Sequence, residues 1–266
     1  SAELASMQSV ERARLASLGV AAGSTVRIAG GDLVVAAYLG RRAAPDEAIL
    51  SMTGQVILRH VECFAPPYRV HPGATPTTSQ RVPGRCRSAF RLDPTNLQVQ
   101  PNANSVNGYT ANTVQPDPNF LLVPSTSPFR EPLADRVVLA GLPADGTDRY
   151  VLGPAVLTGA AVMSAAAQRD STGAWVVDAT MTTAGASALD RISQMAFHQF
   201  IAIELDGVVL SAPLVLPAQT TWTSFNGQVS ISGSLSATEA SRAAIALADG
   251  ALAVPVTVVP FRTLPA

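Results

Sequence analysis

The side chains able to do acid–base or metal chemistry are few in this chain and widely scattered. Its three histidines are His60, His71 and His198. His60 lies in an apolar run typical of a strand and His198 lies among aromatic residues, so both are interpreted as structural imidazoles. His71 stands in a Pro-rich stretch, without a partner that the sequence can place. The acidic candidates likewise form no predictable pair: Asp170, Asp190 and Glu204.

The motifs that mark common active sites are also missing from the sequence. It contains no nucleophile elbow, P-loop, dinucleotide fingerprint or run of metal ligands. We therefore predict no catalytic residue, no cofactor and no metal, and keep an enzyme only as a minor alternative.

Two cysteines, Cys63 and Cys86, stand in a Pro/Gly-rich segment. A bond between them would close a loop of about two dozen residues and stabilise the fold by roughly 3 kcal/mol. Without a second cysteine pair or a well-spaced histidine, zinc is disfavoured. We expect a Cys63–Cys86 disulfide, which favours an oxidising compartment.

Composition indicates a globular protein that does not bind nucleic acid. The 266 residues are 47% hydrophobic and 14% charged, a balance opposite to that of disordered chains. Eighteen basic residues stand against nineteen acidic ones, so no basic stripe is available for phosphates. All the basic residues are arginine, which we interpret as composition bias. The length suits one large or two small domains.

No apolar run reaches the roughly 20 residues of a membrane helix. The longest, such as 251–259, have the length of a strand. The chain begins at Ser1, with no initiator methionine. We expect an extracytoplasmic protein of the periplasm or cell envelope, anchored to the membrane through a segment outside this chain.

Regular elements are expected in two stretches. In the first, a helical stripe ends at Gly19, and a hairpin, a short helix and a strand follow; these are expected at 4–18, 25–28, 32–38, 45–52 and 55–61. In the second, strands alternate with two helices, the later one opened by the capping box Ser236–Glu239; the elements are expected at 156–162, 175–181, 184–195, 201–205, 208–211, 229–233, 236–247 and 254–259.

Between these stretches, residues 63–149 lose periodicity and form an irregular lobe rich in Pro, Asn, Thr and Ser. An ordered lobe or a binding surface is expected, because long structureless loops are unusual in compact domains. Aromatic residues there either form the lobe's own small core or line a groove for an extended polypeptide or acyl chain. The candidate partner-binding residues are Phe64, Tyr68, Phe90, Tyr109, Phe120 and Phe129.

Blocks of sequence in a fixed order resemble one known family. They include Gly159-Ala160-Ala161-Val162, Gly173-Ala174-Trp175-Val176-Val177, Ile201–Pro213, Gly227–Gly233 and Gly250–Pro255, together with Gly54–Val61 near the start. In order and spacing this set resembles the first periplasmic domain of SecD, the accessory subunit of protein export. The middle lobe has no counterpart in the resemblance.

The resemblance implies an α+β fold in which a head subdomain interrupts a ferredoxin-like base. The base is expected at 1–62, completed by 250–262, the lobe at 63–149 and the head at 150–249. Four residues are expected to shape turns and element ends instead of contacting a ligand: Asp206, Gly207, Gly233 and Gly250.

The resemblance also implies a non-catalytic envelope protein that assists export or folding of translocated polypeptides. Its expected partner is a membrane protein complex of the cell envelope, with an unfolded exported polypeptide or a lipid as candidate ligand. The alternative is an accessory partner of another membrane machine, such as an RND-type lipid transporter. Edge strands of the head offer an unfolded client a further route of binding, by β-augmentation.

Overall fold

A computed structural model describes most of the chain, namely residues 2–20, 22, 24–29, 32–37, 48–68, 82, 85–86, 116–127, 133, 135–142, 149–216 and 219–252. Its helices and strands are α1 (Ala2–Ser17), β1 (Thr25–Ala29), β2 (Asp32–Ala36), β3 (Val56–Ala65), η2 (Pro118–Phe120), β4 (Val137–Gly141), β5 (Arg149–Thr158), η5 (Gly159–Ala161), β6 (Val162–Arg169), β7 (Trp175–Met181), α3 (Thr183–Met195), β8 (Ile201–Leu205), β9 (Val208–Ser211), β10 (Gln228–Ser232) and α4 (Ala237–Asp249). The fold class is α+β, as predicted.

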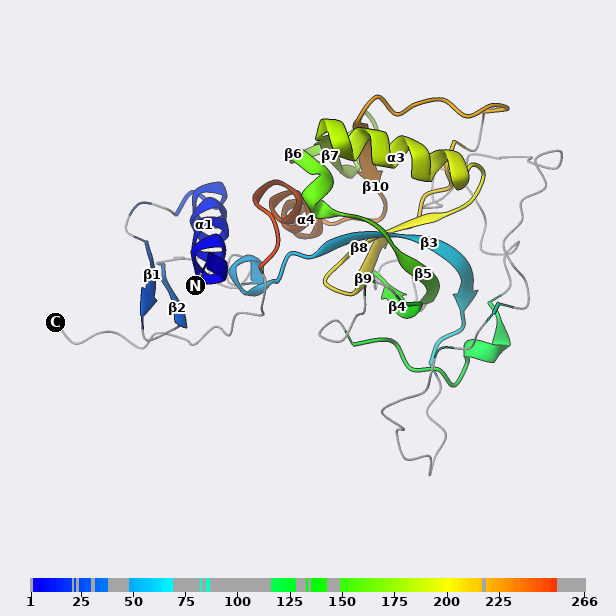
Figure 1. The fold of residues 1–266 in the computed structure, drawn as a ribbon, viewed down its shortest axis with the longest axis horizontal. Coiled ribbons are helices and arrows are strands. Elements are labelled where there is room, and N and C mark those ends of the chain that lie inside the picture. The colour runs from blue at the N-terminus through cyan, green and yellow to red at the C-terminus, as the bar shows by residue number, and fades with distance from the viewer. Residues whose placement is uncertain are drawn as a thin grey trace.

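A small unit at one end of the molecule consists of α1 and the antiparallel hairpin β1–β2 (Figure 1). The helix buries Leu15 against Val26 of β1 and Leu50 of the helical turn at 48–51. It ends where Gly19 takes a φ of +72°, which lets the amide of Val20 bond to the Leu15 carbonyl at 3.0 Å. The predicted helix and hairpin are both present.

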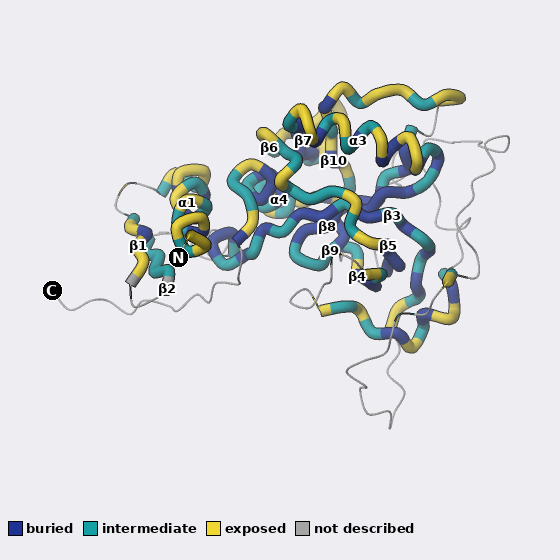
Figure 2. Tube along the Cα trace, in the orientation of Figure 1, coloured by how far each residue is buried: buried dark blue, intermediate teal, exposed yellow. Residues whose placement is uncertain are grey.

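The larger unit is built around a closed barrel with the strand order β3-β5-β4-β9-β8. Strand β3 closes it by pairing antiparallel with both β5 and β8. Because side chains alternate along each strand, one row from every strand points inward. This row is the apolar filling of the barrel and includes Val61, Val137, Leu139, Leu152, Ala202 and Val209. Figure 2 shows buried positions concentrated along these strands.

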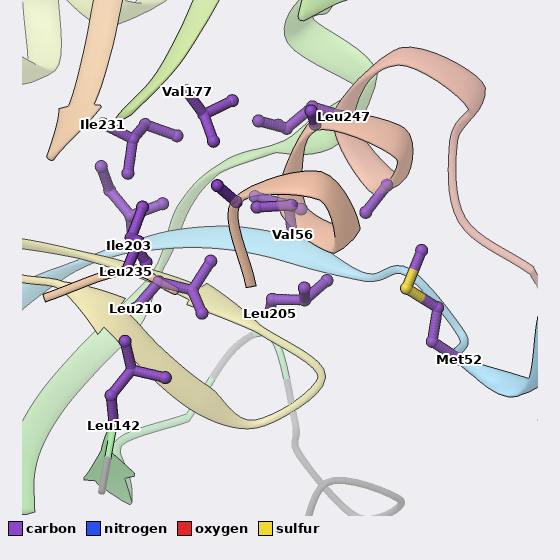
Figure 3. Packing of buried hydrophobic residues seen from close by; sticks show 14 of the residues in the cluster. Met52, Val56, Leu142, Val177, Ile203, Leu205, Leu210, Ile231, Leu235 and Leu247 are labelled. Atoms are coloured by element: carbon purple, nitrogen blue, oxygen red, sulfur yellow. The ribbon is translucent and has the colours of Figure 1, made fainter. Parts of the chain in front are cut away.

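A three-stranded antiparallel sheet, in the order β10-β7-β6, lies beside the barrel. Helix α4 packs between this sheet and the barrel, because its alanine-rich face allows close approach to both. Leu247 and the α4 alanines share a core with Val177 of the sheet and Leu205 of the barrel (Figure 3). The predicted capping box is confirmed: Ser236 Oγ accepts from the Glu239 amide, and Glu239 Oε2 accepts from the Ser236 amide at 2.7 Å.

Helix α3 covers the outer face of the barrel. Its residues Ile192 and Ala196 pack with Ile201 and with the partly buried Leu58 and Leu157. Thr182 caps its first turn by accepting from the Gly185 amide at 3.0 Å. The predicted helix at 184–195 is therefore confirmed to within one residue.

Two features of the barrel differ from the sequence-based expectation. Strand β4 falls inside 63–149, which was expected to be irregular. Its Val137, Val138 and Leu139 are all fully buried, so its sequence carries no alternation that would reveal a strand. Strand β3, expected in the base, pairs inside the barrel instead. The expected last strand at 254–259 lies outside the described residues.

Candidate functional site

The two units meet where two segments of chain, residues 52–55 and 250–252, pass between them. We call these two segments the crossings and the region that they form the joint. Arg14 of α1 reaches both crossings with its guanidinium. Nη1 donates to the Met52 carbonyl at 2.7 Å, and Nη2 donates to the carbonyls of Thr53 at 3.0 Å and Gly250 at 3.1 Å. The Leu252 amide also bonds to the Thr53 carbonyl at 2.7 Å, so the crossings are tied to each other as well as to the helix.

Asp206 holds the first crossing from the barrel side. Its carboxylate accepts from the amides of Gly54 at 3.1 Å and Gln55 at 2.8 Å, and from the hydroxyl of Thr53. Asp206 and Gly207 form the two-residue turn between β8 and β9, with φ of +51° and +78°. These values suit the predicted hairpin turn, and only a short polar residue followed by glycine adopts them readily.

Glu11 lies one turn before Arg14 on α1 and is also fully buried. Its Oε1 accepts from Arg14 Nη1 at 3.2 Å, whereas Oε2 has no hydrogen-bond partner among the described residues. Burial raises the pKa of Glu11 to about 7, and the neighbouring Arg14 guanidinium only partly opposes this. The joint therefore contains a carboxyl group that titrates near neutral pH.

A second buried ion pair lies inside the barrel. Arg59 of β3 donates from Nε to Glu204 Oε1 at 2.9 Å, and both side chains are fully buried. Arg59 Nη1 also donates to the carbonyls of Gly153 at 2.9 Å and Asp135 at 3.1 Å. Arg59 therefore links β3 to β8, to β5 and to the segment before β4, which is a structural role.

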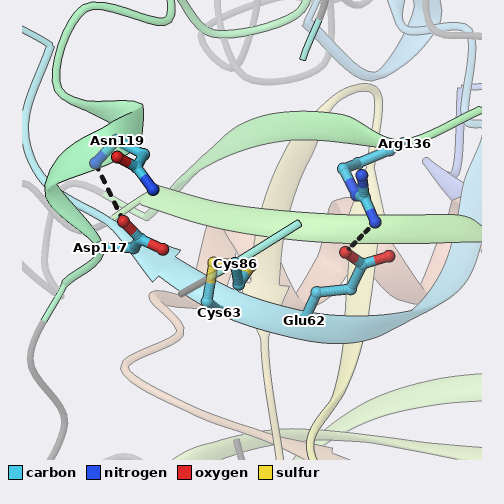
Figure 4. The surroundings of a disulfide bond; sticks show 6 residues. All are labelled: Glu62, Cys63, Cys86, Asp117, Asn119 and Arg136. Carbon is cyan, nitrogen blue, oxygen red and sulfur yellow. Dashed lines mark hydrogen bonds and ion pairs between the residues drawn. A yellow bond between two sulfur atoms is a disulfide. The ribbon is translucent and has the colours of Figure 1, made fainter. Parts of the chain in front are cut away.

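The lobe is fastened to the barrel by a disulfide and an arginine. Cys63 of β3 is bonded to Cys86 with a Cα–Cα distance of 6.0 Å, as expected (Figure 4). Arg149 of β5 donates to the carbonyls of Pro66, Phe120 and Val123 at 2.6 to 2.8 Å. This described part of the lobe therefore shares its packing with β3 and β5.

Cys63, Cys86 and Asp117 bring three potential metal-binding atoms within 4.8 Å of one another. Both sulfur atoms are used by the disulfide, however, so neither is a thiolate ligand. Asp117 accepts from the Asn119 amide at 2.9 Å and caps η2. The cluster therefore has a structural explanation without a metal.

The predicted partner-binding aromatics fall into three groups. Phe120 is completely buried, and Phe64 packs against Tyr150 and Phe200, with ring centroids 5.1 and 6.0 Å away. Tyr68 is 40% exposed and its ring centroid lies 5.7 Å from the Arg149 guanidinium, so among the described members of the set it is the one most open to a partner. Three members lie outside the described residues: Phe90, Tyr109 and Phe129.

The described histidines both contact polar groups. His60 Nε2 bonds to Gln199 Oε1, and His198 Nε2 bonds to the Gln219 carbonyl at 2.8 Å. His198 also stacks on Phe197 with the ring centroids 3.8 Å apart. His71 lies outside the described residues.

The other predicted ionisable and turn residues have structural surroundings. Asp190 accepts from the Phe225 amide at 3.1 Å, and hydrogen bonds from Thr172 lower the pKa of Asp170. Gly250 ends α4 with a φ of +90°, and Gly233 directly follows β10.

Sequence reasoning missed three arginines that are buried among the described residues: Arg14, Arg59 and Arg149. Two signals were available for them. Arg14 immediately precedes Leu15 on the apolar stripe of α1, and Arg59 stands at an inward position of an apolar strand. A charged residue at such a position predicts a buried partner. The hydrogen-bond partners of these arginines are mostly backbone carbonyls of distant segments. No sequence pattern predicts which carbonyls these are.

These features define the class of protein. It is an α+β domain in which a small unit is connected to a unit that contains a barrel, and its buried arginines stabilise the fold. Residues 136–254 match the family model described as the SecDF P1 head subdomain. This part of the chain is thus similar to the head subdomain of SecDF, and the predicted resemblance to the SecD periplasmic domain is confirmed.

Three relatives are similar in sequence. The SecDF translocase subunit of Thermus thermophilus is 37% identical over 42% of this chain and 15% of its own length. The SecD subunits of Endomicrobium trichonymphae and Acetobacter pasteurianus are 34% and 31% identical, over 44% and 56% of this chain and 24% and 25% of their own lengths. The matches therefore span a quarter or less of these relatives.

Two solved structures share the fold. A structure described as the membrane component SecDF that enhances protein export covers 99% of this chain and 94% of its own, with a TM-score of 0.57 and 24% identity. SecDF in a super-membrane-facing form covers 96% of this chain and 27% of its own, with a TM-score of 0.57 and 21% identity. Among the described helices, none has the length and apolar character needed to cross a membrane.

Proposed function

We propose that this chain is the extracytoplasmic part of a SecD-type protein and that it assists the export or folding of translocated polypeptides. The observation that carries the proposal is the match of 136–254 to the SecDF P1 head subdomain, joined to a barrel and base arrangement similar to SecDF over 99% of the chain. The relatives are translocase subunits, and this role comes to the chain by similarity.

An extracytoplasmic location fits the chemistry of the described residues. The Cys63–Cys86 disulfide persists in an oxidising compartment and would be reduced in most cytosols. It fastens the lobe at the point where β3 leaves the barrel. We propose that the chain works beside a membrane protein complex of the cell envelope, held there by a membrane segment of the full protein.

A binding role fits the described ionisable groups better than catalysis does. The guanidinium groups of Arg14, Arg59 and Arg149 are directed at backbone carbonyls and at buried carboxylates. Asp206 and Asp190 accept from backbone amides. Ionisable groups with such partners stabilise the fold. We propose that the folded domain presents binding surfaces to an unfolded polypeptide.

The proposal is tested in cells that carry the native gene with the segment for residues 1–266 removed. Pulse-labelling should show that the precursor of a secreted reporter accumulates, whereas a cytosolic reporter is unaffected. Normal reporter export would refute the proposal. Normal export accompanied by a changed envelope lipid composition would favour the alternative, an accessory partner of an RND-type lipid transporter.

A further inference from the structure

The outer edge of β6 pairs with no other strand among the described residues. β6 stands at the end of the sheet order β10-β7-β6 and pairs only with β7. Helix α4 packs against this strand through Ala165 and Ala167, which lie against the shared core. Figure 1 shows β6 at the outside of the larger unit.

The register shows which backbone groups point outward from β6. The Asp170 amide bonds to the Ala174 carbonyl at 2.9 Å, so these two residues form a hydrogen-bonded pair at the β6–β7 turn. Bonded pairs alternate along an antiparallel ladder. Ser164, Ala166 and Gln168 therefore bond to β7, in pairs with Thr180, Asp178 and Val176. The residues between these bonded positions turn their N–H and C=O groups to the free edge: Ala165, Ala167 and Arg169. The register shifts between Val162 and Ser164, so the alternation holds from Ser164 onward.

Side chains along this edge do little to block an added strand. From Val162 to Gln168 the strand has no charge and no proline, and its centre is Ser164-Ala165-Ala166-Ala167. Natural sheets usually protect exposed edges with lysine, proline or a covering loop. Arg169 is the charged residue of the strand, but its guanidinium is held over the Trp175 ring at 4.8 Å and bonds to the Gly173 carbonyl.

The opposite edge of the same sheet is different. The Met181 amide bonds to the Gly227 carbonyl, so by the same alternation Gln228, Ser230 and Ser232 face outward from β10. Two of these positions are already used. The Gln228 amide bonds to the Phe225 carbonyl at 3.0 Å, and the Ser232 carbonyl accepts from Ser211 Oγ at 2.5 Å. β10 is also only five residues long, against eight for β6.

We propose that the free edge of β6 binds an extended segment of an unfolded polypeptide as a fourth strand of the sheet. The outward N–H and C=O groups of Ala165 and Ala167 would form the central hydrogen bonds. Recognition through the main chain depends little on client sequence, and the small side chains leave room for varied residues beside them. The inference rests on the proposed function, because it names where the client of that function binds.

The experiment uses the full 266-residue chain and reduced, carboxymethylated lactalbumin as a permanently unfolded probe. Amide exchange of the wild-type protein is followed by NMR with and without the probe. Exchange at the Ala165 and Ala167 amides should slow by about tenfold or more on binding, since each gains a hydrogen bond. The Ala166 amide, already bonded to β7, should change much less.

Two proline variants give the matched test. Ala167→Pro removes an outward N–H that the sheet does not use and places a ring at the edge, which edge strands tolerate. It should weaken probe binding by about tenfold or more. Ser230→Pro makes the same change on β10 and should leave binding within about twofold.

The outcomes distinguish a failure of the β6 edge as the binding site from a failure of the proposed function. If the wild-type chain binds the probe but Ala167→Pro binds equally well, and the alternating amides do not slow, the β6 edge is refuted while the proposed function stands. If the wild-type chain does not bind the unfolded probe, both are refuted. Should Ala167→Pro fail to fold, the exchange pattern of the wild-type protein decides alone.

Discussion

Arg14 and Asp206 bind the same short segment of chain from opposite sides. Arg14, on α1, donates to the carbonyls of Met52 and Thr53, and Asp206, in the β8–β9 turn, accepts from the amides of Gly54 and Gln55. The Arg14 guanidinium thus bonds to the carbonyl acceptors of this segment, and the Asp206 carboxylate bonds to its amide donors. This arrangement satisfies the backbone where one unit passes into the other, and it makes the joint sensitive to small changes.

Gly54 is the residue of the joint with least room for a side chain. Its φ is +72°, and a Cβ there would lie 2.4 Å from Arg14 Nη2. We expect Gly54→Ala to lower the free energy of unfolding by about 3 kcal/mol or more, through backbone strain and displacement of Arg14. Gly173→Ala is the control, because Gly173 has a φ of +86° with no atom within 4 Å of its Cβ position. It should cost only about 1–2 kcal/mol in the same denaturant titration. Equal costs would show that the contact with Arg14 contributes nothing.

Replacing Arg14 should be among the most destabilising changes on α1. Arg14→Met removes the Arg14 donor from the Glu11 carboxylate and from the carbonyls of Met52 and Gly250, and we expect a loss of about 3–5 kcal/mol. The Thr53 carbonyl keeps the Leu252 amide as a donor. Arg12→Met, an exposed change on the same helix, should stay within about 0.5 kcal/mol. Thermal unfolding followed by circular dichroism measures both. A loss for Arg14→Met no larger than that for Arg12→Met would contradict the assigned role.

Glu11 should make stability depend on pH between about 4.5 and 7. Its folded pKa of about 7 lies above the reference value of 4.5, so the folded state holds the proton more tightly than the unfolded state. The free energy of unfolding therefore falls as pH rises through this window, by about 2–3 kcal/mol between pH 5 and pH 8. Glu11→Gln removes this carboxyl group. Between pH 5 and pH 8 the free energy of unfolding of the variant should therefore rise by about 2–3 kcal/mol relative to that of the wild type. Parallel stability curves for the two proteins would exclude the assignment.

The Cys63–Cys86 bond should persist when the protein is purified without reductant. Alkylation in denaturant followed by intact-mass measurement should find no free thiol. The denaturant is needed because Cys63 is only 2% exposed in the folded chain. Cys63→Ser with Cys86→Ser should lower the free energy of unfolding by about 3 kcal/mol, since the sequence separation is 23 residues. Two alkylated cysteines in unreduced protein would rule the disulfide out.

Deleting the whole segment 64–135 should damage the larger unit, although a lobe of its own was expected there. Phe120 and Val123 pack with Val138 of β4 and Val151 of β5, so the described part of the lobe covers the outer face of these barrel strands. The test is the near-ultraviolet circular dichroism spectrum of the deletion variant, which should lose its native signal. A retained spectrum would show that the barrel folds without these contacts.

Local signals in the sequence determined several turns and helix ends of this protein. The capping box at Ser236 and Glu239, the turn at Asp206-Gly207 and the end of α1 near Gly19 each depend on residues within a few positions of one another. Short-range hydrogen bonds and backbone preferences decide such features, so their residue types suffice to predict them.

Only the tertiary structure decided which strands close the barrel and where the buried charges go. β4 has no alternating pattern, because both of its faces are covered. β3 joins the barrel by pairing with residues that are between 84 positions (Ala65 with Arg149) and 149 positions (Val56 with Leu205) away along the chain. Arg14 bonds to Gly250, 236 positions away, and Arg59 to Glu204, 145 positions away. Contacts of this kind arise when the whole core forms, because burying a charge is tolerated only once all its partners are in place.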